Sequence, residues 1–422
     1  MALVKRPRQE SLGKPFTRLF SASLASNVAD GVFKTAAPLL AATLTNDPFV
    51  ISLMAALVML PWLLFAIPIG GLVDRLDRRL TLATSNAVRF ILAAFLAATI
   101  ATDQVNIPIL YAVAFLMGIA EVAYDTSSQS LIPQLLKPQH LERGNARLEV
   151  GAITTGEFIG APISGLLYAA AIALPFIWGA FGIGVASVLL FMIPGQVRTD
   201  LKLGRQLQQG KVAPGFWQEI RFGIQYLYED KVLLKLVLFT AFIGFWFAAS
   251  TSTWVLFMLN VMKVDPAWYG LFLTIPAVGS VLGSLIVPKV SNRFGRTNVM
   301  AAAIISSGVL TLLFGLAPNL WVLSIIGVLQ GIAITFWNVL LMSTYHQIIP
   351  NHLFGRIHGT RRTLVWGMMP VGALVGGALA VIDLRLPFFV AGIVCTVTAI
   401  IGVPFVKRLS NLLPVAEEPH PA

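Results

Sequence analysis

Several ionisable residues interrupt long apolar stretches of this sequence. Asp30 and Lys34 are one helical turn apart in the first stretch, Glu121 and Asp125 are one turn apart in a later stretch, and Glu157 lies in the next. A charge at the centre of a bilayer costs about 2.5–3.5 kcal/mol on insertion scales, so such residues usually face a cavity or pair with one another. Carboxylates held in this way can bind and release protons.

The apolar stretches that carry these residues are long enough to cross a membrane. Of the 422 residues, 57% are hydrophobic and 12% are charged, whereas a soluble domain carries about 25% charged residues. The single cysteine, Cys395, excludes an intramolecular disulfide. We predict an all-α polytopic membrane protein with twelve spans, near residues 17–44, 50–72, 80–101, 108–136, 146–171, 174–194, 233–260, 266–288, 297–317, 320–348, 361–382 and 386–406.

The distribution of Lys and Arg predicts the topology. With a cytoplasmic N-terminus, all but four of the 30 basic residues fall in cytoplasmic segments. The exceptions are Lys34 and Arg89 within spans, and Lys263 and Arg385 in the outer loops. This asymmetry is the positive-inside pattern, so we expect both termini to be cytoplasmic, with no cleaved signal peptide. The net charge of +11 then reflects topology rather than nucleic-acid binding.

A long polar connection at residues 195–232 divides the spans into six and six. We therefore expect an N-terminal bundle (1–194), a cytoplasmic linker (195–232) and a C-terminal bundle (233–422). The linker segment 216–228 is amphipathic, and it lies either on the inner membrane surface or in solvent. The halves also look like repeats, because 138–141 (PQHL) matches 350–353 (PNHL) at the same offset that relates 160–165 (GAPISG) to 372–377 (GALVGG).

Three motifs resemble a known family. The loop from Gly70 to Arg79, Gly-x3-Asp-Arg-x2-Arg-Arg, resembles the signature loop of the major facilitator superfamily, with Asp77 where Gly is usual. Together with Leu-Ile-Pro…Glu-Arg-Gly-Asn-Ala at 131–146 and the segment 354–359, it is similar to the branch of macrolide-efflux and enterobactin-exporter-like carriers. The span-five motif 156–165 resembles the antiporter signature. The resemblance implies two pseudo-symmetric six-helix bundles that transport by alternating access.

One family element is absent from this chain. The Arg-x2-Gln-Gly element often seen in span four is missing, and Gly118-Ile119-Ala120-Glu121-Val122 stands near its place. The usual proton-relay arginine is therefore not assigned. The proton-coupling residues that we predict instead are Asp30, Glu121, Asp125 and Glu157. Repulsion between Glu121 and Asp125 would favour a proton on one of them.

Each of these residues also has an ordinary structural interpretation. Asp30 and Lys34 either serve the transport site or form a constitutive ion pair that makes insertion tolerable. Asp125 either carries a proton or simply reaches water at the inner surface. Glu157 either couples protons or pairs with Arg89, for which we favour a structural anchor to a carboxylate.

Substrate contacts are expected from both halves. Large aromatics with a few amides suit a bulky, partly apolar ligand, although packing or lipid contact explains any single aromatic equally well. The residues that we predict to bind substrate are Asn27 and Lys34 of the first span, and Trp246, Trp254, Gln330, Trp337 and Asn338 of the second half.

Gating is expected on the cytoplasmic side. Asp74 can accept hydrogen bonds at the N-terminal end of span eleven, with a weaker second gate at the loop 292–296. Small residues in spans five and eleven would let helices of opposite halves pack closely and rock. The predicted gating residues are Gly70, Asp74, Arg75, Arg78, Arg79, Gly160, Pro162, Arg293 and Arg296.

These features predict a secondary active exporter of small hydrophobic or amphipathic compounds, driven by proton antiport. No Walker-type loop is present to bind ATP, and no nucleophile or metal-ligand motif indicates an enzyme. The alternatives are a proton-coupled importer of a small nutrient, a lipid flippase, or a non-transporting protein with a carrier fold. We expect a monomer in the plasma membrane whose partners are a small-molecule substrate, protons and lipids, without nucleic acid, cofactor or metal.

Overall fold

The computed structural model describes residues 12–73, 76–193, 225–350 and 353–409, and this part of the chain is helical with no strand. The first half contains α1 (Lys14–Leu44), α2 (Pro48–Val73), α3 (Arg78–Ala101), α4 (Ile107–Leu135), the short η1 (Pro138–His140), a continuous rod of α5 (Leu141–Ile153), η2 (Thr154–Gly160) and α6 (Ala161–Ala170), and α7 (Leu174–Phe191). The second half contains a rod of α10 (Lys231–Thr251), α11 (Trp254–Leu256) and η4 (Phe257–Val261), then α12 (Pro266–Phe294), α13 (Arg296–Leu316), α14 (Leu320–Ile348), α15 (Phe354–Ile382) and α16 (Leu386–Arg408).

Within these described ranges, twelve long helical segments coincide with the twelve predicted spans, and the all-α fold is confirmed. Several rods are longer than their apolar stretches: α12 continues to Phe294 and α15 begins at Phe354. The apolar pattern marks only the part that lies in hydrocarbon, whereas the helical hydrogen bonds continue into the polar ends. At the start of α3 the Asp77 carboxylate accepts hydrogen bonds from the backbone N–H groups of Arg79 and Leu80. Asp77 is therefore a helix cap, which explains an acid at this position.

α1 differs from the other rods in its polarity. Within the described ranges, eleven helices are long and apolar enough to cross a membrane, and α1 is not among them. Several of its polar side chains, including Ser23, Ser26 and Thr35, are buried. α1 packs against α4, α5, η2, α6 and α7 of its own half and also touches α11 and α12 of the other. Its polar residues thus face protein rather than lipid, which is the arrangement that a charged spanning helix requires.

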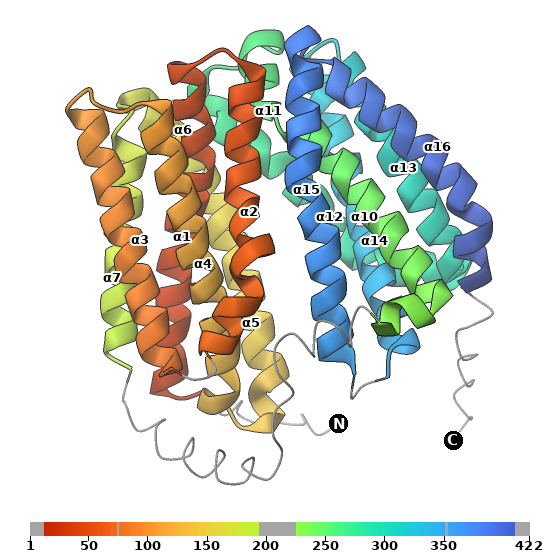
Figure 1. The fold of residues 1–422 in the computed structure, drawn as a ribbon, viewed down its shortest axis with the longest axis horizontal. Helices are drawn as coiled ribbons and strands as arrows, with labels where there is room; N and C mark the ends of the chain where they lie inside the picture. Colours follow the sequence, from red (N-terminus) through yellow and green to blue (C-terminus); the bar gives the residue numbers. More distant parts are fainter. Residues whose placement is uncertain (1–11, 74–75, 194–224, 351–352, 410–422) are drawn as a thin grey trace, which may run out of the picture.

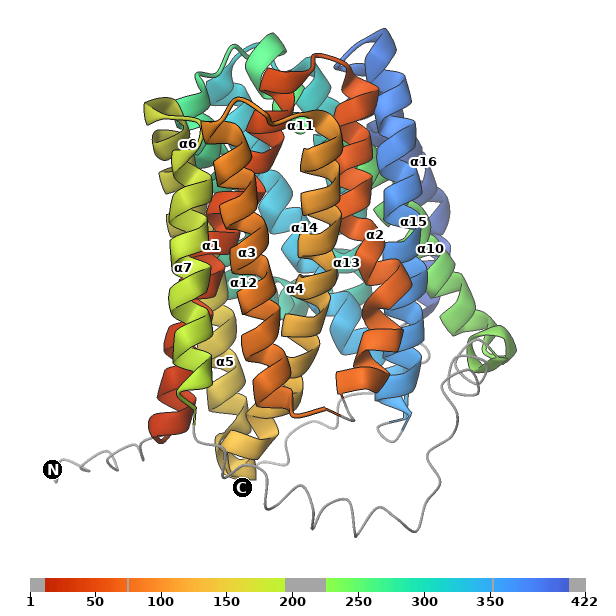
Figure 2. The same cartoon turned by 60° about the vertical axis from the view of Figure 1, so that its left-hand side comes forward.

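The helices form two bundles, one from α1–α7 and one from α10–α16 (Figure 1). The principal contacts between the bundles are α2 with α15, and α6 and η2 with α12. Viewed from the side, the bundles approach each other at the upper end and diverge toward the lower end, where α1 begins and α16 ends (Figure 1). We call this lower end the termini end. Figure 2 shows the first bundle in front, with α1 inside and α3, α4 and α7 outside it.

The repeat predicted from the sequence reappears in the glycine contacts. A Cβ on Gly165 would lie 2.5 Å from the Ala267 carbonyl oxygen of α12, and a Cβ on Gly377, its repeat partner, would lie 1.8 Å from Ser52 of α2. Both contacts cross between the bundles. Gly160 instead packs inside its own bundle, because its Cβ would lie 2.6 Å from the Val28 carbonyl oxygen of α1. The expectation that Gly160 lies between opposite halves is therefore wrong.

The contact between α6 and α12 leaves no space for a side chain. A Cβ on Gly270 would lie 1.8 Å from the Ala161 carbonyl oxygen and 3.2 Å from the Cα atom of Pro162. We expect Gly270→Ala to push α6 and α12 apart, at a cost of about 1–3 kcal/mol typical of overpacking, and so to lower the melting temperature and slow transport. Gly71→Ala is the control, because its Cβ would meet no atom within 4 Å. Equal melting temperatures and transport rates for both variants would contradict a tight inter-bundle contact.

Candidate functional site

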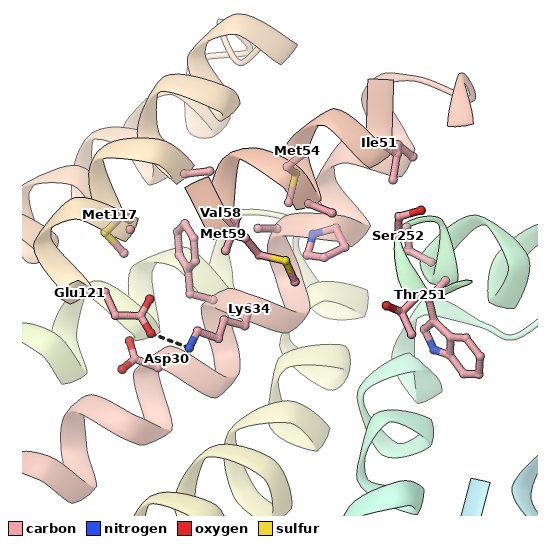
Figure 3. Close-up of a pocket in the computed structure, with 18 of the residues that line it drawn as sticks. Asp30, Lys34, Ile51, Met54, Val58, Met59, Met117, Glu121, Thr251 and Ser252 are labelled. Carbon is pink, nitrogen blue, oxygen red and sulfur yellow. Dashed lines mark hydrogen bonds and ion pairs between the residues drawn. The ribbon is translucent and has the colours of Figure 1, made fainter. Parts of the chain in front are cut away.

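A cavity of about 230 Å³ lies between the two bundles. Its floor and sides come from α1, α2 and α4, and the second bundle closes it with residues around the break between α10 and α11 (Figure 3). Most of its wall is apolar, formed by Phe33, Ala37, Pro38, Ile51, Met54, Ala55, Val58, Met59, Ala114, Met117, Gly118, Trp254, Val255 and Tyr269. The polar contributors are Asp30, Lys34, Arg89, Glu121, Thr251 and Ser252.

An ion pair between α1 and α4 forms the polar side of this cavity. The Lys34 ammonium donates a hydrogen bond to the Glu121 carboxylate at 2.7 Å (Figure 3). The Lys34 side chain is 56% exposed and that of Glu121 19%, and both line the cavity. The pair is therefore accessible to a ligand, yet each charge has a partner when the cavity is empty. Thr251, the last residue of α10, and Ser252 directly after it lie on the opposite side (Figure 3).

A second ion pair lies deeper in the first bundle. The Arg89 side chain is 2% exposed, and its guanidinium donates to the carboxylate of Asp30. It also donates to Ser26 Oγ at 3.2 Å and to Asn86 Oδ1 at 3.1 Å, and it lies 5.6 Å from the centre of the Tyr124 ring. A buried charge needs such a set of partners, because removing one leaves the other unpaired in a low-dielectric site.

These two pairs correct two of the alternatives drawn from the sequence. Asp30 pairs with Arg89 rather than with Lys34, and Arg89 pairs with Asp30 rather than with Glu157. The interpretation of Arg89 as an anchor for a carboxylate agrees with this geometry. Spacing along one helix suggested the Asp30–Lys34 pair, but the structure pairs each residue with a different neighbouring helix.

Two further carboxylates lie near enough to the Lys34 ammonium to attract it. Asp125 and Glu157 both interact electrostatically with Lys34. Glu157 is exposed and lies in η2, a π-helical turn of the kind that often marks functional positions. Asp125 lines a different cavity, between α2, α4 and α15. Around Lys34 the first bundle thus presents more negative than positive charge, which favours cations in the space between the bundles.

The predicted substrate-binding residues are divided between the cavity and the protein core. Lys34 and Trp254 line the cavity, and Trp254 is held by ring contacts with Phe314 and Phe388. The amide of Asn27 instead donates to the Ser23 carbonyl oxygen at 2.7 Å and is not among the lining residues.

The other predicted substrate residues lie in the second bundle and do not line this cavity. Trp246 packs on Phe242 and Phe245, and the buried Trp337 packs on Phe239. Gln330 is buried and donates to Ser307 Oγ at 3.0 Å, which joins α14 to α13. Asn338 is exposed. Their predicted contact with substrate has no support from this arrangement.

The methionines that line the cavity, and Thr251 and Ser252, were not predicted as site residues. Met54 and Met59 belong to an apolar stretch in which no residue stands out. A signal was available for the hydroxyl residues, since the run Ser250-Thr251-Ser252-Thr253 interrupts an apolar span at the point where α10 ends.

Most of the predicted gating arginines that the structure describes contact their own bundle. Arg79 donates to the backbone carbonyl of Phe191 at the end of α7. Arg296 donates to Gln347 Oε1 at 2.8 Å and to the Leu340 carbonyl oxygen at 2.9 Å, both on α14. Arg293 lies over the ring of its neighbour Phe294. Each of these contacts joins residues of the same bundle near the end of a helix. They therefore do not support a gate between the halves.

The remaining gating residues are placed as follows. Gly70 belongs to the last turn of α2, and Arg78 is the first residue of α3. Pro162 lies at the contact of α6 with α12. Asp74 and Arg75 lie outside the described residues, as do most of the amphipathic linker segment and the linker residues before it.

Comparison with known proteins agrees with this architecture. The sequence model of the Major Facilitator Superfamily matches residues 19–360 and 255–421. Multidrug efflux pump Tap of Mycolicibacterium fortuitum is 23% identical, over 94% of this chain and 97% of the relative. Macrolide efflux protein A of Streptococcus pyogenes is 22% identical, over 80% of this chain and 82% of the relative.

Solved structures share the fold at low sequence identity. A bacterial homologue of the iron transporter ferroportin, in an inward-facing state, superposes with a TM-score of 0.76 at 14% identity, covering 94% of this chain and all of that one. The nucleoside transporter NupG superposes with a TM-score of 0.66 at 15% identity, covering 95% and 99%. Because the family model matches nearly the whole chain, the protein belongs to the Major Facilitator Superfamily, whose members are membrane transporters rather than enzymes.

Proposed function

We propose that this transporter exports small hydrophobic or amphipathic compounds across the plasma membrane by proton antiport. The observation that carries the proposal is the Lys34–Glu121 pair on the wall of a largely apolar, methionine-rich cavity. Methionine side chains are flexible and polarisable, so such a wall adapts to ligands of different shape. The names of the relatives, a multidrug efflux pump and a macrolide efflux protein, support export of this class of compound.

The ion pair supplies a means of coupling. A proton on Glu121 removes its negative charge and leaves the Lys34 ammonium without this carboxylate partner. The cavity then becomes more positive by one charge, which disfavours a cationic or apolar ligand. When Glu121 is ionised, its pair with Lys34 is restored and the ligand is accepted. Proton and substrate therefore exclude each other, which is the requirement of an antiporter.

The Asp30–Arg89 pair has a supporting role in this scheme. It joins α1 to α3 one turn before Lys34, so it fixes the part of α1 that carries the ammonium. The buried guanidinium also donates to Ser26 and Asn86, and these contacts help it to hold Asp30 in place. We therefore propose Glu121 as the principal proton carrier, with Asp125 and Glu157 as neighbouring sites through which protons reach it.

The arrangement of the bundles suggests how access alternates. They diverge at the termini end, where the basic loops of the predicted topology gather, and we assign this end to the cytoplasm. The conformation would then receive substrate from the cytoplasmic side. Rocking about the α2–α15 and α6–α12 contacts would close this end and open the other.

Transport by proteoliposomes tests the proposal. With a labelled macrolide outside, vesicles carrying inverted transporter are expected to accumulate it when their interior is acidic. One pH unit corresponds to about 1.4 kcal/mol, which supports about tenfold accumulation for exchange with one proton. An ionophore that collapses the gradient should abolish accumulation, and protein-free vesicles are the control. Accumulation that persists after collapse of the gradient would contradict proton antiport.

A further inference from the structure

A guanidinium lies over two tryptophan rings at the interface of the bundles. The Cζ atom of Arg362 on α15 is 4.2 Å from the ring centre of Trp366, one turn further along the same helix. It is 4.9 Å from the ring centre of Trp62 on α2, in the other bundle. The two rings are 5.6 Å apart and inclined by 68°, so they form two walls of an aromatic cage. Such cages recognise organic cations through the negative faces of the rings.

A cavity of about 270 Å³ adjoins this cage. Trp62 and Ala66 of α2, and Gly359, Arg362, Thr363 and Trp366 of α15, form part of its wall. The remainder comes from one face of α4, namely Asp125, Thr126, Gln129 and Ser130. The cavity therefore combines aromatic faces with a carboxylate and several hydroxyl groups. Its aromatic faces and its carboxylate suit a cationic head group.

Arg362 and Asp125 interact electrostatically within this cavity. They belong to different bundles, and the cation that fills the cage is part of the chain itself. A mobile organic cation would find the same ring faces, provided that Arg362 moved aside. The displaced guanidinium would have Asp125 as a partner on the opposite wall. The cavity thus offers one place for an external cation and another for the residue that it displaces.

We propose that Trp62 and Trp366 form a second binding site for organic cations, separate from the cavity at Lys34 and occupied in this structure by Arg362. The site deepens the proposed export function, because it names a cationic head group as the part of the substrate that is recognised here. Displacing Arg362 also removes a contact that joins α2 to α15, so binding at this site loosens the interface about which the bundles move.

Calorimetric titration of the detergent-purified protein with choline, and with its uncharged isostere 3,3-dimethyl-1-butanol, tests this proposal. Arg362→Gln empties the cage, and we expect choline to bind about fivefold more tightly or better, with no such gain for the neutral isostere. Adding Trp62→Leu to this variant should remove the gain. Arg361→Gln is the matched control, because Arg361 lies over the Tyr345 ring, 4.4 Å from its centre, rather than in the cage.

Unchanged or weaker choline binding by Arg362→Gln would overturn the proposal, and so would an equal gain for the neutral isostere. If Arg362→Gln does not fold, Trp62→Leu alone provides the test: choline binding should weaken relative to the parent, and unaltered binding would contradict the site. No proton gradient enters these measurements. A transporter that fails the antiport test can therefore still pass this one, and the reverse also holds.

Discussion

Replacement of Glu121 by Gln is expected to abolish proton-driven accumulation of substrate. Glutamine has nearly the same shape and its carbonyl oxygen can still accept a hydrogen bond from Lys34, so the cavity should persist. It cannot be ionised, however, and the site loses the charge that a proton would neutralise. We expect the accumulation ratio in proteoliposomes to fall from about tenfold to one under a gradient of one pH unit. Exchange of labelled for unlabelled substrate without a gradient should continue.

Glu149→Gln is the matched control for this variant. Glu149 is an exposed carboxylate on α5 and is not among the residues that line the cavity. The Glu149→Gln variant should accumulate substrate to the same ratio as the parent protein. Accumulation by Glu121→Gln at the parental ratio would show that another group carries the proton, and Glu157 and Asp125 would be the next to examine.

Replacement of Arg89 by Gln is expected to destabilise the protein more than any other single change proposed here. Arg89 is 2% exposed, and its loss leaves the carboxylate of Asp30 without its cationic partner. Breaking a buried pair by removing one member typically costs about 3–5 kcal/mol. We expect a large fall in melting temperature, or loss of monodisperse protein, when the variant is extracted into detergent and analysed by size-exclusion chromatography.

The double variant Asp30→Asn/Arg89→Gln separates the cost of an unpaired charge from the loss of packing. With both charges removed, much of the lost stability should return, since amides can hydrogen-bond to each other and to Ser26. A double variant as unstable as Arg89→Gln would indicate that packing of the guanidinium, rather than its charge, holds α3 to α1. If Arg89→Gln alone were as stable as the parent, the Asp30–Arg89 pair would contribute nothing to the stability of the protein.

The fold could be predicted from the sequence because its signals are local. Twelve apolar stretches and the asymmetry of Lys and Arg require only counting, and the structure has a helix at each stretch. The repeat was visible at Gly165 and Gly377, which occupy equivalent contacts between the bundles. The ends of α12 and α15 were missed, because hydropathy reports where the hydrocarbon ends and not where the helix ends.

The site was predicted only in part, because the spacing of residues along one helix does not determine which residues pair between helices. Asp30, Lys34, Glu121 and Trp254 were singled out and the cavity brings them together. Their partners depend on how α1 rotates against α3 and α4, so the Asp30–Arg89 pair could not be derived from the sequence. Gln330 was chosen because an amide suits a partly apolar ligand, but its side-chain nitrogen donates to Ser307 within its own bundle.

Proton release on substrate binding shows directly whether proton and substrate exclude each other at Glu121. The purified protein is held in weakly buffered detergent solution at mildly acidic pH, and substrate is added while the pH is recorded. We expect the parent protein to release protons as the substrate binds, and Glu121→Gln to bind the substrate with little or no release. Equal release by both proteins, or substrate binding to the parent without any release, would contradict it.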